Sequence, residues 1–169
     1  MRLYAGKVSN IAGEVTRSLL ASKDIEAESP KEVEADVASV LNHYLTMERE
    51  VNERAKDVIE RTGRPQSEYQ RVRTLAAQEK GIKIGDETLD YLLDQVVEMF
   101  QNSNNVDEIF AEDVELRRKM APVFKKYMAL DDALDAEVRA QIRHMKEGTR
   151  DFDIEYQRVL EQIKRKKGL

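Results

Sequence analysis

The stretch Glu-Tyr-Gln-Arg-Val at residues 68–72 occurs a second time, letter for letter, at residues 155–159. Eight residues after the last valine of each copy stands the same Lys-Gly pair, at 80–81 and at 167–168. Upstream of these copies, apolar residues of the first half of the chain align with apolar residues of the second half at offsets of 83 and 81. Such small changes of register predict an internal duplication with insertions in the loops.

The duplication predicts two helical repeats, one at residues 1–82 and one at residues 83–169. A repeat of about 80 residues is close to the size at which a single hydrophobic core is marginal. We therefore expect the two repeats to depend on each other or on a partner, and a homo-oligomer is compatible with this expectation.

The first repeat has the periodicity of helices in a short, long, short order. Apolar residues at three- and four-residue spacing predict a first helix over residues 8–19. Ser29 and Pro30 are typical of a helix start, and the long helix that follows should run to Gly63. The third helix should end before Gly81, and its apolar face consists of Tyr69, Val72, Leu75 and Ala76.

The second repeat follows the same plan with one interruption. Its long helix carries an apolar face formed by Val114, Met120, Val123, Phe124, Tyr127, Leu130, Leu134, Val138 and Ile142. Pro122 lacks an amide donor and disfavours the helical conformation of Ala121, so we predict a kink or break near Pro122. The fold class predicted from both repeats is all-α, with two tandem three-helix modules in an elongated arrangement.

Composition excludes several classes of protein. Charged residues make up 36% of the 169 residues and aromatic residues 6%, a balance that favours long helices. The absence of Cys excludes disulfides, thiolate metal sites and cysteine nucleophiles. No apolar run approaches the roughly 20 residues that span a bilayer, and residues 1–7 lack the apolar core of a signal peptide. We therefore expect a cytoplasmic protein.

No motif for catalysis or cofactor binding is present. His43 and His144 each lack a carboxylate three residues earlier, so the Glu-x-x-His pattern of di-iron proteins is missing. Phosphate-binding glycine loops, zinc spacings and the Gly-x-Ser-x-Gly elbow are missing as well. The sequence therefore predicts no enzyme activity, no catalytic residue, no cofactor and no metal.

Charge is distributed unevenly along the chain. Residues 86–115 contain ten acids and no Lys or Arg, and the acids singled out as a candidate interaction surface are Asp107, Glu108, Glu112 and Asp113. The end of the chain is basic, with Lys164, Arg165, Lys166 and Lys167. A basic end can bind nucleic acid, an anionic membrane or an acidic protein surface. Alternatively, these cations stabilise a helix C-terminus, and the acids form a solvated face.

The repeated Glu-Tyr-Gln-Arg motif is a further candidate for an interaction site. Tyr69 and Tyr156 lie on the apolar faces of their helices, so their rings should point into the core with the hydroxyl at its rim. Arg71 and Arg158 lie on a different face, from which they can pair with acids of the long helices. The motif is interpreted either as packing and ion pairing kept in both copies or as a duplicated partner-binding face.

Several segments resemble a known family. The longest is Val-Asp-Glu-Ile-Phe-Ala-Glu-Asp-Val-Glu-Leu-Arg-Arg-Lys at 106–119, and the others are residues 1–3, 48–55, 134–139, 147–150, 154–158 and 167–169. Together they resemble the bacterial family catalogued as domain of unknown function 507, over nearly the whole chain. Phe152 stands where that family has Trp near the last helix. The resemblance implies a bacterial, all-helical, cytoplasmic protein, and it implies no activity, cofactor or catalytic residue.

Two classes of function follow from these observations. The first is a non-catalytic helical scaffold or adaptor that binds another bacterial protein through its helix faces. The second is a factor associated with nucleic acid or the ribosome through the basic end. The net charge of −5 opposes the second class, and so does the lack of aromatic residues among the basic ones.

Overall fold

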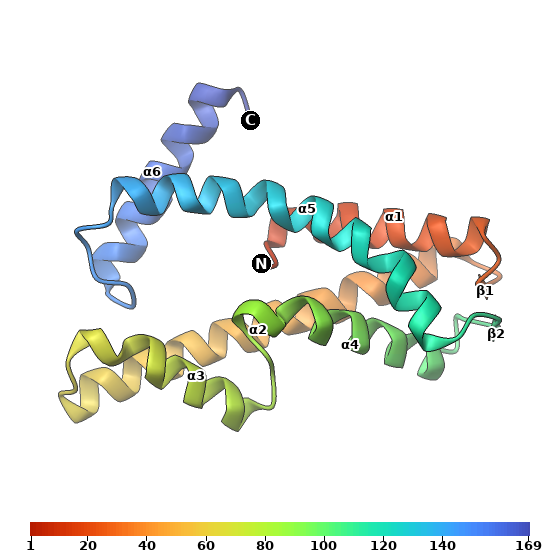
Figure 1. The fold of residues 1–169 in the computed structure, drawn as a ribbon, viewed down its shortest axis with the longest axis horizontal. Helices are drawn as coiled ribbons and strands as arrows, with labels where there is room; N and C mark the ends of the chain where they lie inside the picture. The colour runs from red at the N-terminus through yellow and green to blue at the C-terminus, as the bar shows by residue number, and fades with distance from the viewer. The chain divides into compact units, whose positions relative to one another are not determined.

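The computed structural model describes residues 1–169 and contains six α-helices, three short 3-10 helices and one two-stranded sheet. The α-helices are α1 (Val8–Ala21), α2 (Pro30–Thr62), α3 (Tyr69–Lys80), α4 (Thr88–Asn102), α5 (Asp113–Gln141) and α6 (Arg150–Lys167), as Figure 1 shows. The 3-10 helices are η1 (Ala5–Lys7), η2 (Gln66–Glu68) and η3 (Gly85–Glu87), and the strands are β1 (Ile25–Glu26) and β2 (Glu108–Ile109). The predicted all-α fold class is confirmed.

The order of elements occurs twice along the chain. A 3-10 helix, a short helix, a strand, a long helix and another short helix appear as η1, α1, β1, α2 and α3, and again as η3, α4, β2, α5 and α6. The exception is η2, which precedes α3 and has no counterpart before α6. The origin of this order by duplication stays a prediction.

Two compact units make up the structure, and each takes one segment from either half of the sequence. Unit 1 consists of Met1–Thr46 and Lys83–Ala129, and unit 2 consists of Met47–Ile82 and Leu130–Leu169. Each long helix therefore contributes its first part to unit 1 and its last part to unit 2. The predicted boundary at residue 82 separates repeats along the sequence, whereas both compact units include residues from both repeats.

Unit 1 is closed at one end by the pairing of two loops. The loop after α1 contains β1 and the loop after α4 contains β2, and the two strands pair antiparallel with Ile25 opposite Ile109 and Glu26 opposite Glu108. Ile25 is fully buried, while both glutamates are exposed. Because each strand has only two residues, no alternating pattern in the sequence predicts it.

The core of unit 1 comes from the helix faces expected from the apolar spacing. The buried residues of α1 include Val8, Ile11, Ala12, Val15 and Leu19, and those of α4 include Leu92, Val96 and Phe100. In α2, the buried Tyr44 donates a hydrogen bond from its hydroxyl to the carbonyl oxygen of Lys83, at 2.8 Å. That bond joins the middle of α2 to the segment that precedes α4.

We predict a kink or a break near Pro122, and helix α5 runs without interruption from Asp113 to Gln141, so of these two alternatives the break does not occur. Pro122 is exposed and lies inside the helix. Figure 1 shows that the helix axis bends in its first half, which is the half that contains the proline. The bend lets the helix continue where the proline ring and its missing amide would disturb a straight one.

The buried face of α5 differs from the predicted one, because two of the predicted residues are exposed and the buried Leu116 and Met128 were not predicted. Val114 is 70% exposed and Leu130 is 56% exposed, although both belong to the predicted apolar face. In the unit 1 part of α5 the fully buried residues are Leu116, Met120, Phe124 and Met128, at four-residue spacing. Apolar spacing alone does not say which of two neighbouring stripes faces the core.

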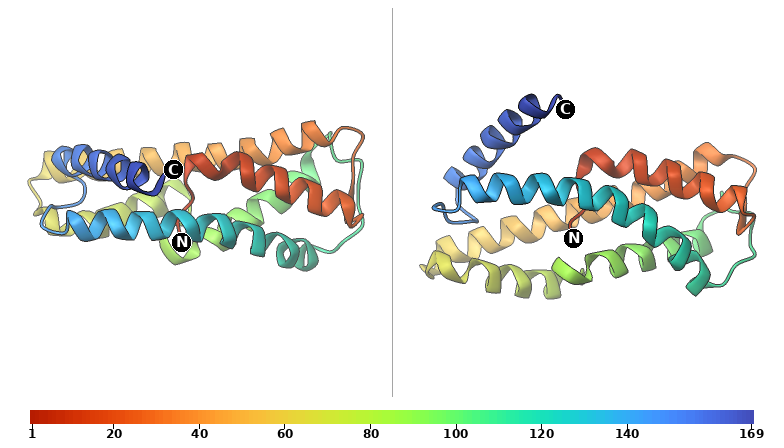
Figure 2. Two further views of the ribbon diagram at one scale, coloured as in Figure 1. Left: turned by 90° about the horizontal axis from the view of Figure 1, so that it is seen from above. Right: turned by 45° about the horizontal axis from the view of Figure 1, so that its top comes forward.

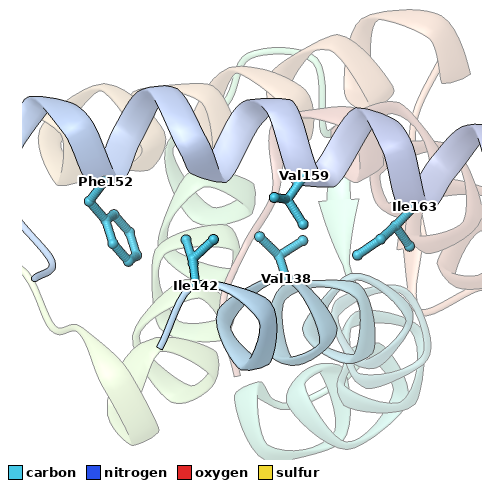
Figure 3. Packing of buried hydrophobic residues seen from close by; sticks show 5 residues of the cluster. All are labelled: Val138, Ile142, Phe152, Val159 and Ile163. Atoms are coloured by element: carbon cyan, nitrogen blue, oxygen red, sulfur yellow. The ribbon is translucent and has the colours of Figure 1, made fainter. Parts of the chain in front are cut away.

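Unit 2 contains two hydrophobic clusters. After α5 the chain reverses direction into α6 (Figure 2). Figure 3 shows Val138 of α5, and Ile142 just after the end of that helix, facing Phe152, Val159 and Ile163 of α6. The second cluster joins α2 to α3 through Ala55, Ile59, Tyr69 and Val72. Leu75, predicted on the apolar face of α3, is instead 47% exposed.

The turn before α6 brings the two parts of unit 2 into contact. Thr149 caps α6, because its hydroxyl oxygen accepts a hydrogen bond from the amide of Phe152 at 3.2 Å. Gly148 precedes it with φ +86, and a Cβ atom there would lie 2.5 Å from Cδ2 of Tyr69. The Tyr69 ring therefore packs directly on a backbone position that only glycine fits.

Candidate protein-interaction surface

The loop between α4 and α5 is held in place by its backbone. The amide of Asp107 donates to the carbonyl oxygen of Glu26, and the amide of Phe110 donates to that of Asp24, both at 2.8 Å. The amide of Ala111 donates to the same Asp24 oxygen at 3.3 Å. These bonds fix the chain on both sides of β2, so the loop has a defined conformation rather than many.

An ion pair between the buried carboxylate of Asp24 and Lys119 of α5 also holds the loop that contains β1. The Asp24 side chain is 10% exposed, and Nζ of Lys119 donates to its two carboxylate oxygens at 2.8 and 2.6 Å. The Ser22 hydroxyl donates to the same carboxylate. Burial alone would raise the pKa of the Asp24 carboxyl, but the hydrogen bonds from Lys119 and Ser22 outweigh it and hold this pKa below its ordinary value. The pair therefore links the β1 loop to α5 at neutral pH.

Side-chain hydrogen bonds also fix the first turn of α5. The amide of Glu112 donates to Oε2 of Glu115 at 3.3 Å, which is one half of a capping box. Asp113 accepts a hydrogen bond from the Gln101 side chain of α4 at 3.0 Å. Acids at this position also interact favourably with the positive end of the helix dipole.

The backbone and side-chain bonds described above hold residues 107–115, which we call the acidic-apolar segment. Two of its residues are apolar and exposed: Phe110 at 60% and Val114 at 70%. The acids singled out from the sequence lie in the same segment and are all exposed, namely Asp107, Glu108, Glu112 and Asp113. Phe110 and Val114 thus place two large apolar side chains at the surface of a segment whose backbone is fixed and whose other exposed residues are acids.

The cations that follow this segment do not neutralise it. Arg117 pairs with Asp94 of α4 at 2.8 Å, and Lys119 pairs with Asp24. Arg118 makes no ion pair, and neither do the side chains of Asp107 and Glu108. The segment therefore keeps its negative charge.

The four cations at 164–167 form the last turn of α6 and are exposed. Lys167 pairs with Glu137 of α5 at 2.9 Å, Arg165 lies 3.9 Å from Glu161, and the other two lysines make no ion pair. Cations at this position offset the negative end of the helix dipole. Two of the four predicted basic residues, Arg165 and Lys167, thus lie near acids of the same chain.

The two arginines of the repeated motif do not meet the long helices. Arg71 is exposed and makes no ion pair, whereas Arg158 pairs with Glu155 of its own helix at 2.5 Å. The expected pairing of these arginines with acids of the long helices therefore does not occur. The tyrosines behave as expected, since Tyr69 is buried and the half-buried Tyr156 donates its hydroxyl to Asp135 at 2.5 Å.

The arginine that does reach a long helix is Arg73, which no motif in the sequence indicates. Its Nη2 lies 3.6 Å from Oε2 of Glu48, and its Nε donates to Oδ1 of Asn52 at 2.6 Å. Glu48 is only 5% exposed. The sequence does indicate that Glu48 is buried, because it stands four residues after Tyr44 and three before Val51, on the buried face of α2.

A polar pocket of about 540 Å³ lies in unit 2, between the end of α2 and the turn before α6. Lys56 lines it, but this amine donates to Asp153 at 2.6 Å. Burial alone would lower the pKa of Lys56, and the bond to Asp153 outweighs it and raises this pKa, so the amine is protonated and not nucleophilic at neutral pH. The Thr149 hydroxyl in the same pocket is engaged in capping α6.

The two histidines and the carboxylates do not form a catalytic or metal-binding group. His43 and His144 are both exposed, and His144 lies in the turn after α5 rather than within the helix. No three or more His, Cys, Asp or Glu residues are grouped so that they could hold a metal ion. None of the helices is long and apolar enough to cross a membrane.

Comparison with known proteins places the chain in a family. The family described as "Protein of unknown function (DUF507)" matches residues 1–169, which is the whole chain. The chain belongs to the DUF507 family. No curated protein matches it. Membership of this family assigns no activity to the chain.

Proposed function

We propose that this DUF507 protein is a non-catalytic helical adaptor that binds another protein through the acidic-apolar segment. The observation that carries the proposal is the 60% exposure of Phe110 on a backbone fixed by β-pairing. A fixed aromatic side chain loses little conformational entropy when it is buried by a partner, which makes it suitable as an interface anchor.

One further feature supports an adaptor over an enzyme. The pocket in unit 2 has its lysine and its threonine engaged in structural contacts. A nucleophile and a base within hydrogen-bonding distance are the minimum for covalent catalysis, and this pocket does not combine them.

Site-specific photo-crosslinking tests the proposal. A photoreactive phenylalanine replaces Phe110 in the full chain, expressed in its native host, and the control carries it at Leu130, which is similarly exposed at 56%. We expect a discrete crosslinked protein at position 110 that is absent at position 130. The crosslink should disappear when Val114 is also replaced by Glu. A crosslink that forms equally at both positions, or at neither, contradicts the proposal.

A second candidate function is nucleic-acid binding through the last turn of α6. It is favoured by Lys164 and Lys166, which are exposed and make no ion pair. The test compares RNA and DNA binding at two salt concentrations, with the full chain, the chain without residues 164–169 and the Lys164→Gln/Lys166→Gln variant. Binding that survives physiological salt and requires these residues supports this function, and absence of binding at low salt removes it.

A further inference from the structure

We propose that the partner of the acidic-apolar segment is a basic protein segment that combines arginine with an apolar side chain. This inference rests on the proposed adaptor function and specifies the chemistry of the partner. The evidence comes from the direction of the side chains around β2 and from the charges that face one another there.

The strand register separates an inner and an outer face. Ile25 and Ile109 stand opposite each other, and Ile25 is 1% exposed, so this pair marks the inner face. Successive side chains of a strand point to opposite faces. Glu108 therefore points outward, in agreement with its exposure, and Phe110, the first residue after β2, is 60% exposed.

Two carboxylates face each other on the outer face. Glu26 and Glu108 are paired in register across the two strands, both are exposed, and neither makes an ion pair. Like charges directly opposite one another destabilise a strand pair. A cation placed between them removes this repulsion, so the free protein pays a cost that a cationic partner relieves.

Arginine fits this place better than lysine. Its planar guanidinium has five donors, enough to bridge two carboxylates, and it stacks on aromatic rings. Phe110, two residues after Glu108, supplies such an exposed ring, and Val114 supplies a second apolar contact four residues later. An arginine with an apolar neighbour therefore uses both the charge and the exposed apolar area.

The charges also argue against other occupants. Nucleic acids and anionic membranes carry the same sign as the segment and are repelled by it. The basic end of a second copy has the right sign, but Lys167 and Arg165 are already near Glu137 and Glu161. A contact between two different surfaces of identical chains also extends into open chains unless it closes into a ring. The partner is therefore assigned to a different protein.

Selection from a displayed library of random peptides tests this chemistry. The full chain is the bait, and the Phe110→Ala variant is used for counter-selection. We expect enriched peptides to contain arginine or several basic residues together with an aromatic or large aliphatic one. An enriched peptide, synthesised and titrated, should bind Phe110→Ala at least about tenfold more weakly than the wild type. Leu130→Ala serves as the control for loss of an exposed apolar side chain.

A matched pair of charge variants tests the role of the facing glutamates. Glu26→Gln/Glu108→Gln removes two charges at the proposed site, and Asp90→Asn/Glu98→Gln removes two exposed charges from α4. The first variant should weaken peptide binding several-fold and reduce its dependence on salt, whereas the second should do neither.

The outcomes separate this inference from the proposed function. Enrichment of neutral or acidic peptides that still require Phe110 overturns the basic partner and leaves the adaptor function standing. Equal effects of the two charge variants also overturn it. Self-association is measured by sedimentation of the wild type and of Phe110→Ala. Self-association that depends on Phe110 shows that the occupant is a second copy of the chain, and it overturns the assignment of the partner to a different protein. The adaptor function itself fails if neither peptides nor crosslinks depend on position 110.

Discussion

Replacing Gly148 with alanine should destabilise the protein more than the same replacement at any other glycine with a similar backbone. Gly148 has φ +86, and a Cβ atom would lie 2.5, 2.7 and 2.7 Å from three carbons of the Tyr69 ring. Gly81 has nearly the same backbone, with φ +80, and no atom within 4 Å of its Cβ position. Gly81→Ala is therefore the matched control.

The expected magnitudes follow from this comparison. A non-glycine residue in the left-handed conformation costs roughly 1–2 kcal/mol, which both variants share. Overpacking of a well-packed site costs typically about 1–3 kcal/mol, and only Gly148→Ala incurs it because the Tyr69 ring is 4% exposed and confined. We therefore expect Gly81→Ala to lower the free energy of unfolding by about 1–2 kcal/mol and Gly148→Ala by about 2–5 kcal/mol.

Urea unfolding followed by far-ultraviolet circular dichroism measures both values. A double-mutant cycle with Tyr69→Ala then isolates the clash. In that background the cost of Gly148→Ala should fall to that of Gly81→Ala, because the ring is gone. Equal costs of the two glycine variants in the wild-type background would refute the contact between Tyr69 and Gly148.

Three further variants test other features. Asp24→Asn should lower the free energy of unfolding at neutral pH, by less than the roughly 3–5 kcal/mol of a fully buried pair, because the Lys119 side chain is 35% exposed. The pKa of Asp24 is lower in the folded protein than in the unfolded chain. The Asp24 carboxylate therefore contributes to the free energy of unfolding above its unfolded pKa of about 4, and this contribution is lost as the pH falls through the folded-state pKa. The wild type and Asp24→Asn should therefore converge in acid-unfolding curves. Tyr44→Phe removes the hydrogen bond to the carbonyl oxygen of Lys83 and should cost about 0.5–1.5 kcal/mol in urea titrations, and an unchanged value would count against that bond. Pro122→Ala should raise the melting temperature, with a gain of up to about 3 kcal/mol, because an exposed helical position regains an amide donor; a lower melting temperature would contradict this.

Local signals in the sequence were sufficient to place most helices. The spacing of apolar residues located α1, and Gly81, with φ +80, ends α3 where it was expected. Pro122 shows the limit of a local signal, because a proline predicts a disturbance but its neighbours decide between a break and a bend. Val114 and Leu130 show the same limit, because the face of α5 that becomes buried depends on helices distant in the sequence.

The candidate surface was predicted in part. The density of acids around Asp107 and Glu112 is visible in the sequence, but the pairing of Glu26 with Glu108 joins residues more than eighty positions apart, as the register shows. The exposure of Phe110 could not be predicted either, because an aromatic residue near a helix start is more often buried. Long-range contacts thus decide which of the acids share a face with an exposed aromatic side chain.

The composition of the two units has a consequence for synthesis on the ribosome. Unit 1 is complete only after Ala129 has been made, and unit 2 needs the segment that begins at Leu130. A nascent chain of 82 residues therefore contains half of each unit, and the apolar faces of α1 and of the first part of α2 lack the residues of unit 1 that follow Ile82. Such exposed surface is what chaperones bind and what leads to aggregation. We expect the first half, expressed alone, to depend on chaperones or to be degraded rather than to persist as a folded domain.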